Sequence, residues 1–447
     1  PLTGKKSLAA NPTLKNRCAK GKVIFMTLTT PPTSGGDTIQ ELTVEEIRAK
    51  VGTGMQIDDP EEHLLLSMGP QHPSTHGVLR LLLELDGETV VNLAPDIGFL
   101  HTGIEKEMET KTYLKSLVLT DRMDYLTPMS NNAGYIMAIE KLLDVEITPR
   151  ARVIRVILLE LARIASHLVW LGTHALDLAA MTVFLYCFRE REYILDLFEM
   201  VAGQRMMVSY FRPGGLWRDV PEEFVPAVRH FLDFFPAKIA DYEALLKSNP
   251  IFLRRTKDIG YVSPEDAVAW GLTGPTLRAS GVELDFRKVQ PYLGYEDYDF
   301  DIPLSDVGDV YARYRVRMQE FWQSLRIIEQ ALDKLPDGPV NIDDPKIVPP
   351  PRSELGRSME AVIHHFKLWT EGFTVPEGYV YQTIESPRGE FSCYLRSDGT
   401  SKPARVHFRT PSYTNLASLP MMAKGRFLAD VVALIGSIDI VLGDIDR

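Results

Sequence analysis

The stretch Thr148–Asp177, TPRARVIRVILLELARIASHLVWLGTHALD, decides the architecture of this chain of 447 residues. Thr148 is a favourable helix N-cap and Pro149 suits the first helical position, so the sequence predicts a helix that begins here. Apolar residues recur at steps of three and four from Val153 to Leu171, the spacing that forms one apolar face. We therefore expect an amphipathic helix that is heavily buried.

Helical patterns on both sides of this stretch predict a helical bundle over residues 101–335. The further expected helices span residues 104–119, 131–144 (capped by Asn131), 182–203, 221–246 and 307–335, with a short helix after Ser263. Residues 336–352 hold six prolines and few apolar side chains. The sequence therefore predicts a linker after the bundle.

Short strands are expected outside the bundle. The Asp86-Gly87 pair between the apolar runs 78–85 and 88–93 predicts a β-hairpin. The expected C-terminal elements are a helix at 354–370, strands at 379–385, 390–396 and 405–409, and helical stretches at 412–424 and 425–436. The predicted fold class is α+β, mainly α. Its regions are an extension (1–58), a hairpin region (59–100), the bundle (101–335) and a C-terminal α+β region (336–447).

The N-terminal residues are expected to form a flexible extension, with one short helix at 43–51. Residues 1–25 carry six lysines and arginines and no acid. An organelle-targeting segment would also be basic and acid-poor, but it would hold more Arg and Ser. The composition favours an upstream extension, with Met26 as a natural start.

Composition excludes several classes of function. The chain has 49 basic and 60 acidic residues, a net charge of −11, which argues against a nucleic-acid binder. Its three cysteines, Cys18, Cys187 and Cys393, form no C-x-x-C pair, too few for a disulfide scaffold, an iron–sulfur cluster or a four-cysteine zinc site. The apolar stretch 175–188 is shorter than the roughly 20 residues that a bilayer requires. Any redox centre is thus expected on another chain, and any membrane role should be peripheral.

Two histidines share the segment GPQHPSTHG, residues 69–77. Pro70 and Pro73 prevent a regular helix, so the sequence predicts a turn-rich loop. His72 and His76 are then either rigidly presented imidazoles or hydrogen-bonded turn residues.

Two further groups could carry chemistry. The segment DRMDY, residues 121–125, places three charges and a phenol between two helices, and the residues alone favour a surface turn with a half-buried tyrosine. His174 and Asp177 share a helical face, with His167 two turns earlier. A carboxylate this deep in an apolar helix needs a partner. Asp177 therefore either pairs in the core or orients a catalytic histidine.

Other polar segments are expected to be structural. The charge run at 189–192 is typical of a solvated or interfacial helix surface, and His364-His365 cannot both face one site. The segment Arg388-Gly389-Glu390 is typical of a hairpin turn. The chain has no Walker loop and no G-x-S-x-G motif, so nucleotide-binding and hydrolase functions lose their usual support.

At residues 69–81, GPQHPSTHGVLRL, the sequence resembles the D subunit (49-kilodalton type) of respiratory complex I, the proton-pumping NADH:quinone oxidoreductase. The resemblance continues through HTGIEK (101–106), KTY (111–113), DRMDY (121–125), THALDLAAMT (173–182), REREYILDLFE (189–199), RPGG (212–215), GEFSCYLRSDG (389–399) and LADVVALIGSIDIVLGDIDR (428–447). These motifs are long and collinear, and the resemblance covers residues 60–447.

The resemblance implies roles at individual positions. His76 and Tyr125 match the pair that binds the quinone headgroup, where an imidazole and a phenol hydrogen-bond the carbonyl oxygens and donate protons. Asp177 matches the carboxylate that orients this histidine and favours its charged form. Thr173, one turn earlier, is a further pocket-lining candidate. Arg122 matches the arginine beside the terminal 4Fe–4S cluster of the neighbouring subunit, where its positive charge stabilises the reduced cluster.

The resemblance also implies the fold of the nickel–iron hydrogenase large subunit, a helical bundle with small antiparallel β elements. Those enzymes hold their metal with two C-x-x-C pairs. Here His72 and His76 occupy the corresponding loop, and the tail at 442–447 has no cysteine. Hydrogenase activity is therefore excluded, the vacated cavity is free for a quinone, and neither metal nor cofactor is expected on this chain.

Partners and location follow from the same resemblance. The expected partners are the small iron–sulfur (B-type), C-type, ferredoxin-like (I-type) and membrane H-type subunits, together with quinone. The motif HTGIEK and Ser130-Asn131-Asn132 are more typical of bacterial relatives, which implies the cytoplasmic face of a bacterial inner membrane. An inactive scaffold is the alternative, but it would not need His76, Tyr125 and Asp177 together.

One position departs from the family pattern. Many relatives carry a histidine near the cluster, two residues after the arginine of a G-x-R-x-H stretch. Here the run 203–207 reads GQRMM, so Met207 replaces it. Because Met207 cannot titrate, we expect the potential of the cluster to depend less on pH.

Overall fold

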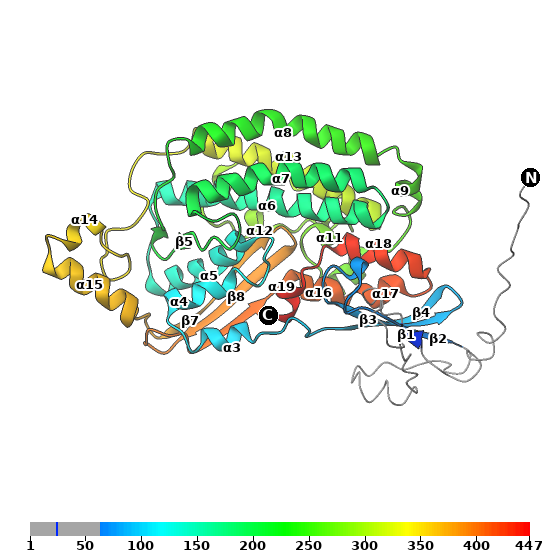
Figure 1. Ribbon diagram of the computed structural model, residues 1–447, viewed down its shortest axis with the longest axis horizontal. Helices are drawn as coiled ribbons and strands as arrows, with labels where there is room; N and C mark the ends of the chain where they lie inside the picture. The colour runs from blue at the N-terminus through cyan, green and yellow to red at the C-terminus, as the bar shows by residue number, and fades with distance from the viewer. Residues whose placement is uncertain (1–23, 26–62) are drawn as a thin grey trace, which may run out of the picture. The chain divides into compact units, whose positions relative to one another are not determined.

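The computed structural model describes residues 24–25 and 63–447 (Figure 1). Apart from residues 24–25, the expected extension (1–58), with its helix at 43–51, lies outside the described residues. The contacts divide the chain into an N-terminal unit, Pro1–Phe99 with Leu419–Val432, and a helical unit, Leu100–Ser418 with Ala433–Arg447.

The N-terminal unit is built on an antiparallel hairpin. Strands β3 (Arg80–Asp86) and β4 (Thr89–Asp96) pair around Gly87, which confirms the hairpin predicted from the Asp-Gly pair. Strand β2 (Leu64–Met68), which was not predicted, extends the sheet antiparallel to β3, and β1 (Ile24–Phe25) is parallel to β2. Helix α17 (Leu419–Ala423) packs on β4.

Four long helices run side by side in the helical unit (Figure 1). They are α6 (Pro149–Asp177), α7 (Met181–Ala202), α8 (Phe224–Leu246) and α13 (Val310–Asp333). The predicted start of α6 is confirmed, because the Thr148 side chain accepts a hydrogen bond from the backbone N–H of Ala151 at 3.4 Å. Most of α6 is buried, as its apolar pattern predicts.

A three-stranded antiparallel sheet lies beside the bundle. It contains β7 (Gly378–Ser386), β8 (Gly389–Ser397) and β9 (Arg405–Arg409), close to the predicted strands. Helix α5 (Pro128–Leu143) packs against β7 and β8. The shorter elements of this unit are α3 (Ile104–Met108), α4 (Tyr113–Thr120), β5 (Phe211–Arg212), β6 (Gly215–Leu216), α9 (Pro250–Arg254), α10 (Pro264–Ala269), α11 (Gly274–Arg278), α12 (Phe286–Val289), η2 (Tyr295–Asp297), α14 (Arg352–Leu355), α15 (Met359–Thr370), α16 (Pro411–Ala417) and α19 (Leu442–Asp446). Helix α18 is Leu428–Ile438.

Some predicted helix bounds are wrong. The helix expected at 104–119 is two helices, α3 and α4, because Thr110 turns back to donate to the Glu107 carbonyl at 2.7 Å and ends the first helix. The helix expected at 354–370 is α14 and α15, and the second is capped by Ser358, whose hydroxyl accepts a hydrogen bond from the Ala361 N–H. The stretches expected at 412–424 and 425–436 also divide differently, into α16, α17 and α18.

Helix α5 begins earlier than predicted. Pro128 occupies its first turn, where a missing N–H costs nothing. Asn131, the predicted cap, instead lies inside the helix. Its side-chain amide donates to the carbonyls of Thr120 and Asp124 at 3.0 and 3.1 Å. Asn131 therefore ties α5 to the loop before it.

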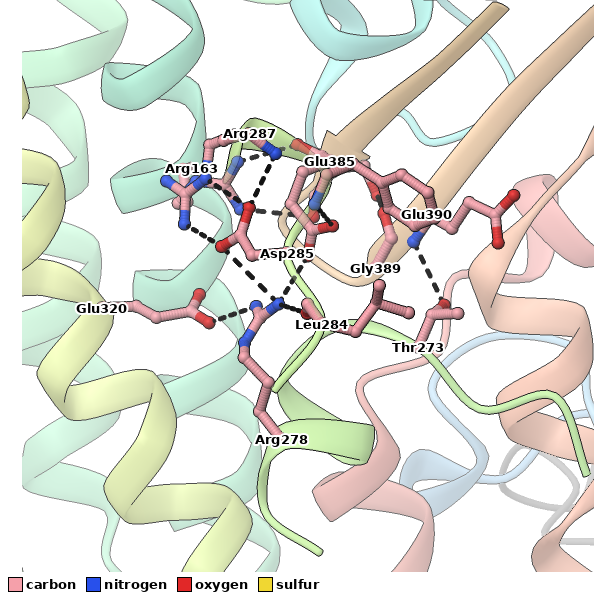
Figure 2. Close-up of polar contacts among 12 residues, drawn as sticks. Arg163, Thr273, Arg278, Leu284, Asp285, Arg287, Glu320, Glu385, Gly389 and Glu390 are labelled. Carbon is pink, nitrogen blue, oxygen red and sulfur yellow. Dashed lines mark hydrogen bonds and ion pairs between the residues drawn. The ribbon is translucent and has the colours of Figure 1, made fainter. Parts of the chain in front are cut away.

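A buried ionic network joins α6, α11, α13 and β7 (Figure 2). Arg278 lies between Glu320 of α13 and Glu385 of β7, at 2.6 and 2.8 Å. Arg287 binds Asp285 at 2.7 Å and Glu160 of α6 at 3.2 Å. All of these charged partners are buried, and an unpaired charge there would be strongly destabilising.

His167 belongs to the same network. Its Nε2 lies 2.7 Å from the Glu320 carboxylate. Burial acts to raise the pKa of Glu320, but Arg278 and His167 more than offset it and hold that pKa well below its usual range. Glu320 is therefore ionised, and His167 is part of the buried core rather than an open site.

The contact between α5 and β8 allows a direct test of packing. Gly134 faces the Phe391 ring so closely that a Cβ would lie 2.6 Å from it. Gly134→Ala should lower the free energy of unfolding by about 1–3 kcal/mol, although alanine favours a helix. The shift in the thermal unfolding midpoint of the native protein measures this.

Gly172→Ala is the matched control, because its Cβ would meet its nearest atoms at an ordinary 3.4 Å. It should leave the midpoint unchanged or raise it slightly. Equal effects of the two substitutions would contradict the close approach of α5 to β8.

Candidate functional site

The loop between α4 and α5 carries the DRMDY segment, and it is not a surface turn. Asp121, Met123 and Asp124 are buried, whereas Arg122 is exposed and Tyr125 is half-buried. The expectation of a surface turn is therefore wrong, although the half-buried tyrosine is confirmed. Asparagines of α5 bind the loop from within the core, so its conformation is set by the bundle.

Asp121 joins this loop to residues 203–210. Its two carboxylate oxygens accept hydrogen bonds from the Asn132 amide at 2.7 Å and the Ser209 hydroxyl at 2.5 Å. Burial raises the pKa of Asp121, and these two hydrogen bonds act to lower it. Asp121 therefore holds two segments together directly beside the exposed Arg122.

Asp124 anchors the other side of the loop. It accepts hydrogen bonds from the Thr127 hydroxyl at 2.7 Å and from the Arg388 guanidinium at 2.6 Å. Arg388 lies in the turn between β7 and β8 and is wholly buried. The sequence predicts the hairpin turn correctly, but its role as an ionic anchor was missed.

The C-terminal helix α19 packs against the same loop. A Cβ on Gly443 would lie 2.5 Å from the Met123 carbonyl oxygen and 3.2 Å from a ring carbon of Tyr125. Only glycine permits this approach. Tyr125 is thus held between its own loop and the tail.

The neighbourhood of Tyr125 shifts its acidity. Burial raises the pKa of the Tyr125 phenol above its ordinary value, the Asp124 charge raises it further, and Arg388 acts to lower it. The phenol therefore keeps its proton until a strong base or a developing negative charge takes it. A neutral phenol is a hydrogen-bond donor at any physiological pH.

Asp177 and Thr173 lie at the end of α6. Asp177 is the last helical residue and is only half-buried, so the expectation of a carboxylate deep in an apolar helix is wrong. The Thr173 hydroxyl donates to the backbone carbonyls of Val169 and Trp170 at 2.9 and 3.2 Å. His174 is buried and stacks on the Trp170 indole.

The histidine loop belongs to the N-terminal unit. Residues Pro73–Thr75 form a short 3-10 turn, which confirms the predicted turn-rich loop. The His72 Nδ1 accepts a hydrogen bond from the Ser74 N–H at 3.2 Å and caps this turn. His76 follows it in a left-handed conformation, with φ 53°, and is half-exposed. Of the two imidazoles, His72 therefore has a structural role in the turn.

Comparison with known proteins decides the family. The profile described as "Respiratory-chain NADH dehydrogenase, 49 Kd subunit" matches residues 177–447. The D 2 subunit of NADH-quinone oxidoreductase from Chloroflexus aurantiacus is 60% identical over 405 residues, 89% of this chain and 98% of that protein. The chain belongs to the 49 kDa subunit family of respiratory-chain NADH dehydrogenase.

Other members of the 49 kDa family are similar over the same length. The D 2 subunit from a Roseiflexus species is 60% identical over 91% of this chain and 100% of its own. The D subunit from Geotalea uraniireducens is 55% identical over 86% of this chain and 99% of its own. The family expected from the motifs is thereby confirmed.

Membrane-spanning helices and metal sites are both missing from the described part of this 49 kDa-family chain. Within residues 63–447, no helix has both the length and the apolar character needed to cross a bilayer. In the same residues, no group of three or more His, Cys, Asp and Glu side chains has the arrangement of a metal site.

The charge run at 189–192 is not simply solvated. Glu190 and Arg191 are buried, and Glu190 accepts a hydrogen bond from the Tyr242 hydroxyl at 2.9 Å. The expectation of a solvated or interfacial helix surface is therefore wrong for Glu190 and Arg191, which are buried within this chain. Because α7 packs between α6 and α8, part of this charge run faces neighbouring helices.

The turn that carries Met207 follows α7. Arg205 is paired with Glu192, Asp196 and Glu199 of that helix. Met207, in a left-handed conformation with φ 54°, is half-buried.

The tail contact predicts a local effect of one substitution. Gly443→Ala forces the Met123 carbonyl or the tail to move, which should loosen residues 121–127. Their amide hydrogen exchange should become on the order of tenfold faster, which corresponds to about 1.4 kcal/mol of local stability. Exchange of this segment, followed by mass spectrometry of the native protein, measures it.

Gly356→Ala is the control, because a Cβ there would meet no atom within 4 Å. It should leave exchange at 121–127 unchanged. Unchanged exchange in Gly443→Ala as well would show that the tail does not hold the loop.

Proposed function

We propose that this chain forms the quinone-reducing site of NADH–quinone oxidoreductase, together with the small iron–sulfur (B-type) subunit. Relatives about 60% identical over most of the chain bear the name of the D subunit of that enzyme. The observation that carries the proposal is the Tyr125 loop, which holds a neutral phenol half-exposed on a rigid buried base. Such a phenol is a preorganised donor to a carbonyl oxygen.

The chemistry assigns a role to each candidate residue. Reduction of a quinone to a quinol adds two electrons and two protons. The electrons come from the 4Fe–4S cluster of the neighbouring subunit, and His76 and Tyr125 hydrogen-bond the two carbonyl oxygens and donate protons. The resemblance to the D subunit assigns Asp177 to orienting the imidazole of His76 and Thr173 to lining the pocket. Arg122, exposed beside the buried Asp121, presents a fixed positive charge to the cluster.

The remaining features of the proposal concern the assembly. The chain acts only within the complex, with the B-type, C-type, ferredoxin-like I-type and membrane H-type subunits as partners. It lies peripherally on the cytoplasmic face of a bacterial inner membrane. We further propose the fold of the nickel–iron hydrogenase large subunit, since four long helices pack side by side with a small antiparallel sheet beside them, as the resemblance implies.

Substitution at the phenol tests the function. Tyr125→Phe removes one hydroxyl and should reduce quinone reductase activity of the assembled complex by about 100-fold or more, and His76→Ala should do the same. Oxidation of NADH by artificial acceptors should remain intact. Steady-state assays of both activities on the purified complexes measure this.

Tyr379→Phe is the matched control, because that tyrosine is 75% exposed on β7. A quinone analogue should also protect the Tyr125 loop from chemical labelling in the intact complex. Normal quinone kinetics in assembled Tyr125→Phe, or no protection, would favour the inactive scaffold instead.

Met207 predicts a property of the cluster. Because no imidazole titrates at this position, the midpoint potential of the terminal cluster should change less between about pH 6 and 8 than in histidine-bearing relatives. Met207→His should restore the steeper dependence. Redox titration of the assembled complex, followed by electron paramagnetic resonance, measures both slopes, and a wild-type slope as steep as in those relatives would defeat the prediction.

A further inference from the structure

Three buried carboxylates surround one guanidinium beside Tyr125. Arg388 binds the Asp124 carboxylate at 2.6 Å and the Asp439 carboxylate at 3.3 Å, and its Nε donates to the Asp439 carbonyl at 2.9 Å. Each of the three guanidinium nitrogens of Arg388 therefore donates a hydrogen bond. Asp444, which also lies within its electrostatic reach, receives none of these bonds.

Asp444 is the carboxyl that this arrangement leaves poorly satisfied. It is 1% exposed, and one oxygen accepts only a long hydrogen bond, 3.4 Å, from the Ser412 N–H. The other oxygen, Oδ1, is buried and has no hydrogen-bond partner among the residues that the structure describes. An ionised carboxylate in this position would be costly, whereas a protonated one is tolerated.

The groups that face Asp444 come from three sides. The loop before α5 presents Asp124, and the β7–β8 turn presents Arg388. Helix α16 presents Ser412 and, just before it, Thr410, whose hydroxyl donates to the Asp444 carbonyl at 2.9 Å. None of these α16 contacts carries a charge.

The charged residues of the tail itself are engaged elsewhere. Asp446 accepts from the Leu100 N–H at 2.7 Å, and Arg447 binds the Phe408 carbonyl and lies 3.8 Å from Glu105. The charged groups that act on the pKa of Asp444 are therefore Asp124, which raises it, and Arg388, which lowers it. Burial, and then the Asp124 charge, raise the pKa of Asp444 to about 7.

We propose that Asp444, which lies next to the ion pair of Asp124 and Arg388, stores one proton near Tyr125 and returns it to the phenol after each turnover. The inference rests on the proposed function, since it assigns a proton source to the residue that donates to quinone. Gly443, the residue before Asp444, lies against the Tyr125 ring, and the charge of Arg388 acts on both the Asp444 carboxyl and the Tyr125 phenol.

The step balances in protons and electrons. The quinone takes its electrons from the iron–sulfur cluster of the neighbouring subunit, and Tyr125 breaks its O–H bond to protonate one quinol oxygen. The phenolate then takes the proton of Asp444, whose O–H bond breaks and leaves a carboxylate. A proton from solvent restores Asp444 before the next turnover.

Infrared spectroscopy of the assembled complex tests the stored proton directly. The wild type should show the carbonyl band of a protonated carboxylic acid at pH 6 that is lost by about pH 8.5, because the pKa of Asp444 is about 7. Asp444→Asn should lack this pH-dependent band. Asp337→Asn, the same change at an exposed position, should keep it.

Kinetics tests whether the proton is used. In the wild type, the rate of quinone reduction should decline between pH 6 and 8, because Asp444 loses its proton over this range. Asp444→Asn should be roughly tenfold slower at pH 6 with a nearly flat profile, since solvent alone then reprotonates the phenol. Asp444→Glu, which again holds a proton, should restore both the rate and the decline.

The outcomes separate this inference from the proposed function. A wild type without the band, a band that persists in Asp444→Asn, or an Asp444→Asn profile that still declines would each overturn the proton store, while the loss of activity in Tyr125→Phe would still support the quinone site. Activity retained in Tyr125→Phe would defeat the quinone site, while the band would still show that Asp444 holds a proton.

Discussion

The arrangement of the helical unit depends on a network of buried ion pairs. Arg278 is the clearest case, because its guanidinium joins Glu320 of α13 to Glu385 of β7, and Arg287 adds Glu160 of α6. Long helices alone could slide along one another, since apolar faces are weakly directional. Buried ion pairs accept one geometry, and losing one partner costs several kcal/mol. They therefore define how the bundle meets the sheet.

Buried charges also meet beside Tyr125, but there the carboxyl groups outnumber the guanidinium groups. Asp124 and Asp439 share one guanidinium, that of Arg388, and Asp444 has no direct share of it. In the core network, Arg278 and His167 hold the pKa of Glu320 well below its usual range. Beside Tyr125, one carboxyl is left near the point where it gains or loses a proton. The network around Arg388 thus differs from that around Arg278 because Asp444 has no direct ion-pair partner within the described part of the chain.

Local patterns in the sequence predicted what depends on neighbours along the chain. The start of α6, the Asp-Gly hairpin and strands β7 to β9 follow from caps, turns and alternation, and the motif at 121–125 marked Tyr125. Arg388 and Asp124 are separated by 264 residues, so no local pattern reveals their bond. The burial of half of the 189–192 run likewise depends on α8, a later helix. Long-range pairing is what a single sequence conceals.

The close contact of Gly134 with Phe391 has a consequence for binding. Because Gly134 has no side chain, α5 can lie close against β8. Helix α5 also carries the asparagines whose side chains hydrogen-bond the 121–125 loop. The loop that carries the Tyr125 phenol is therefore held in place by contacts within the chain. Binding of a molecule at this loop would therefore cost little conformational entropy of the protein. The entropy that the ligand itself loses would be the larger cost.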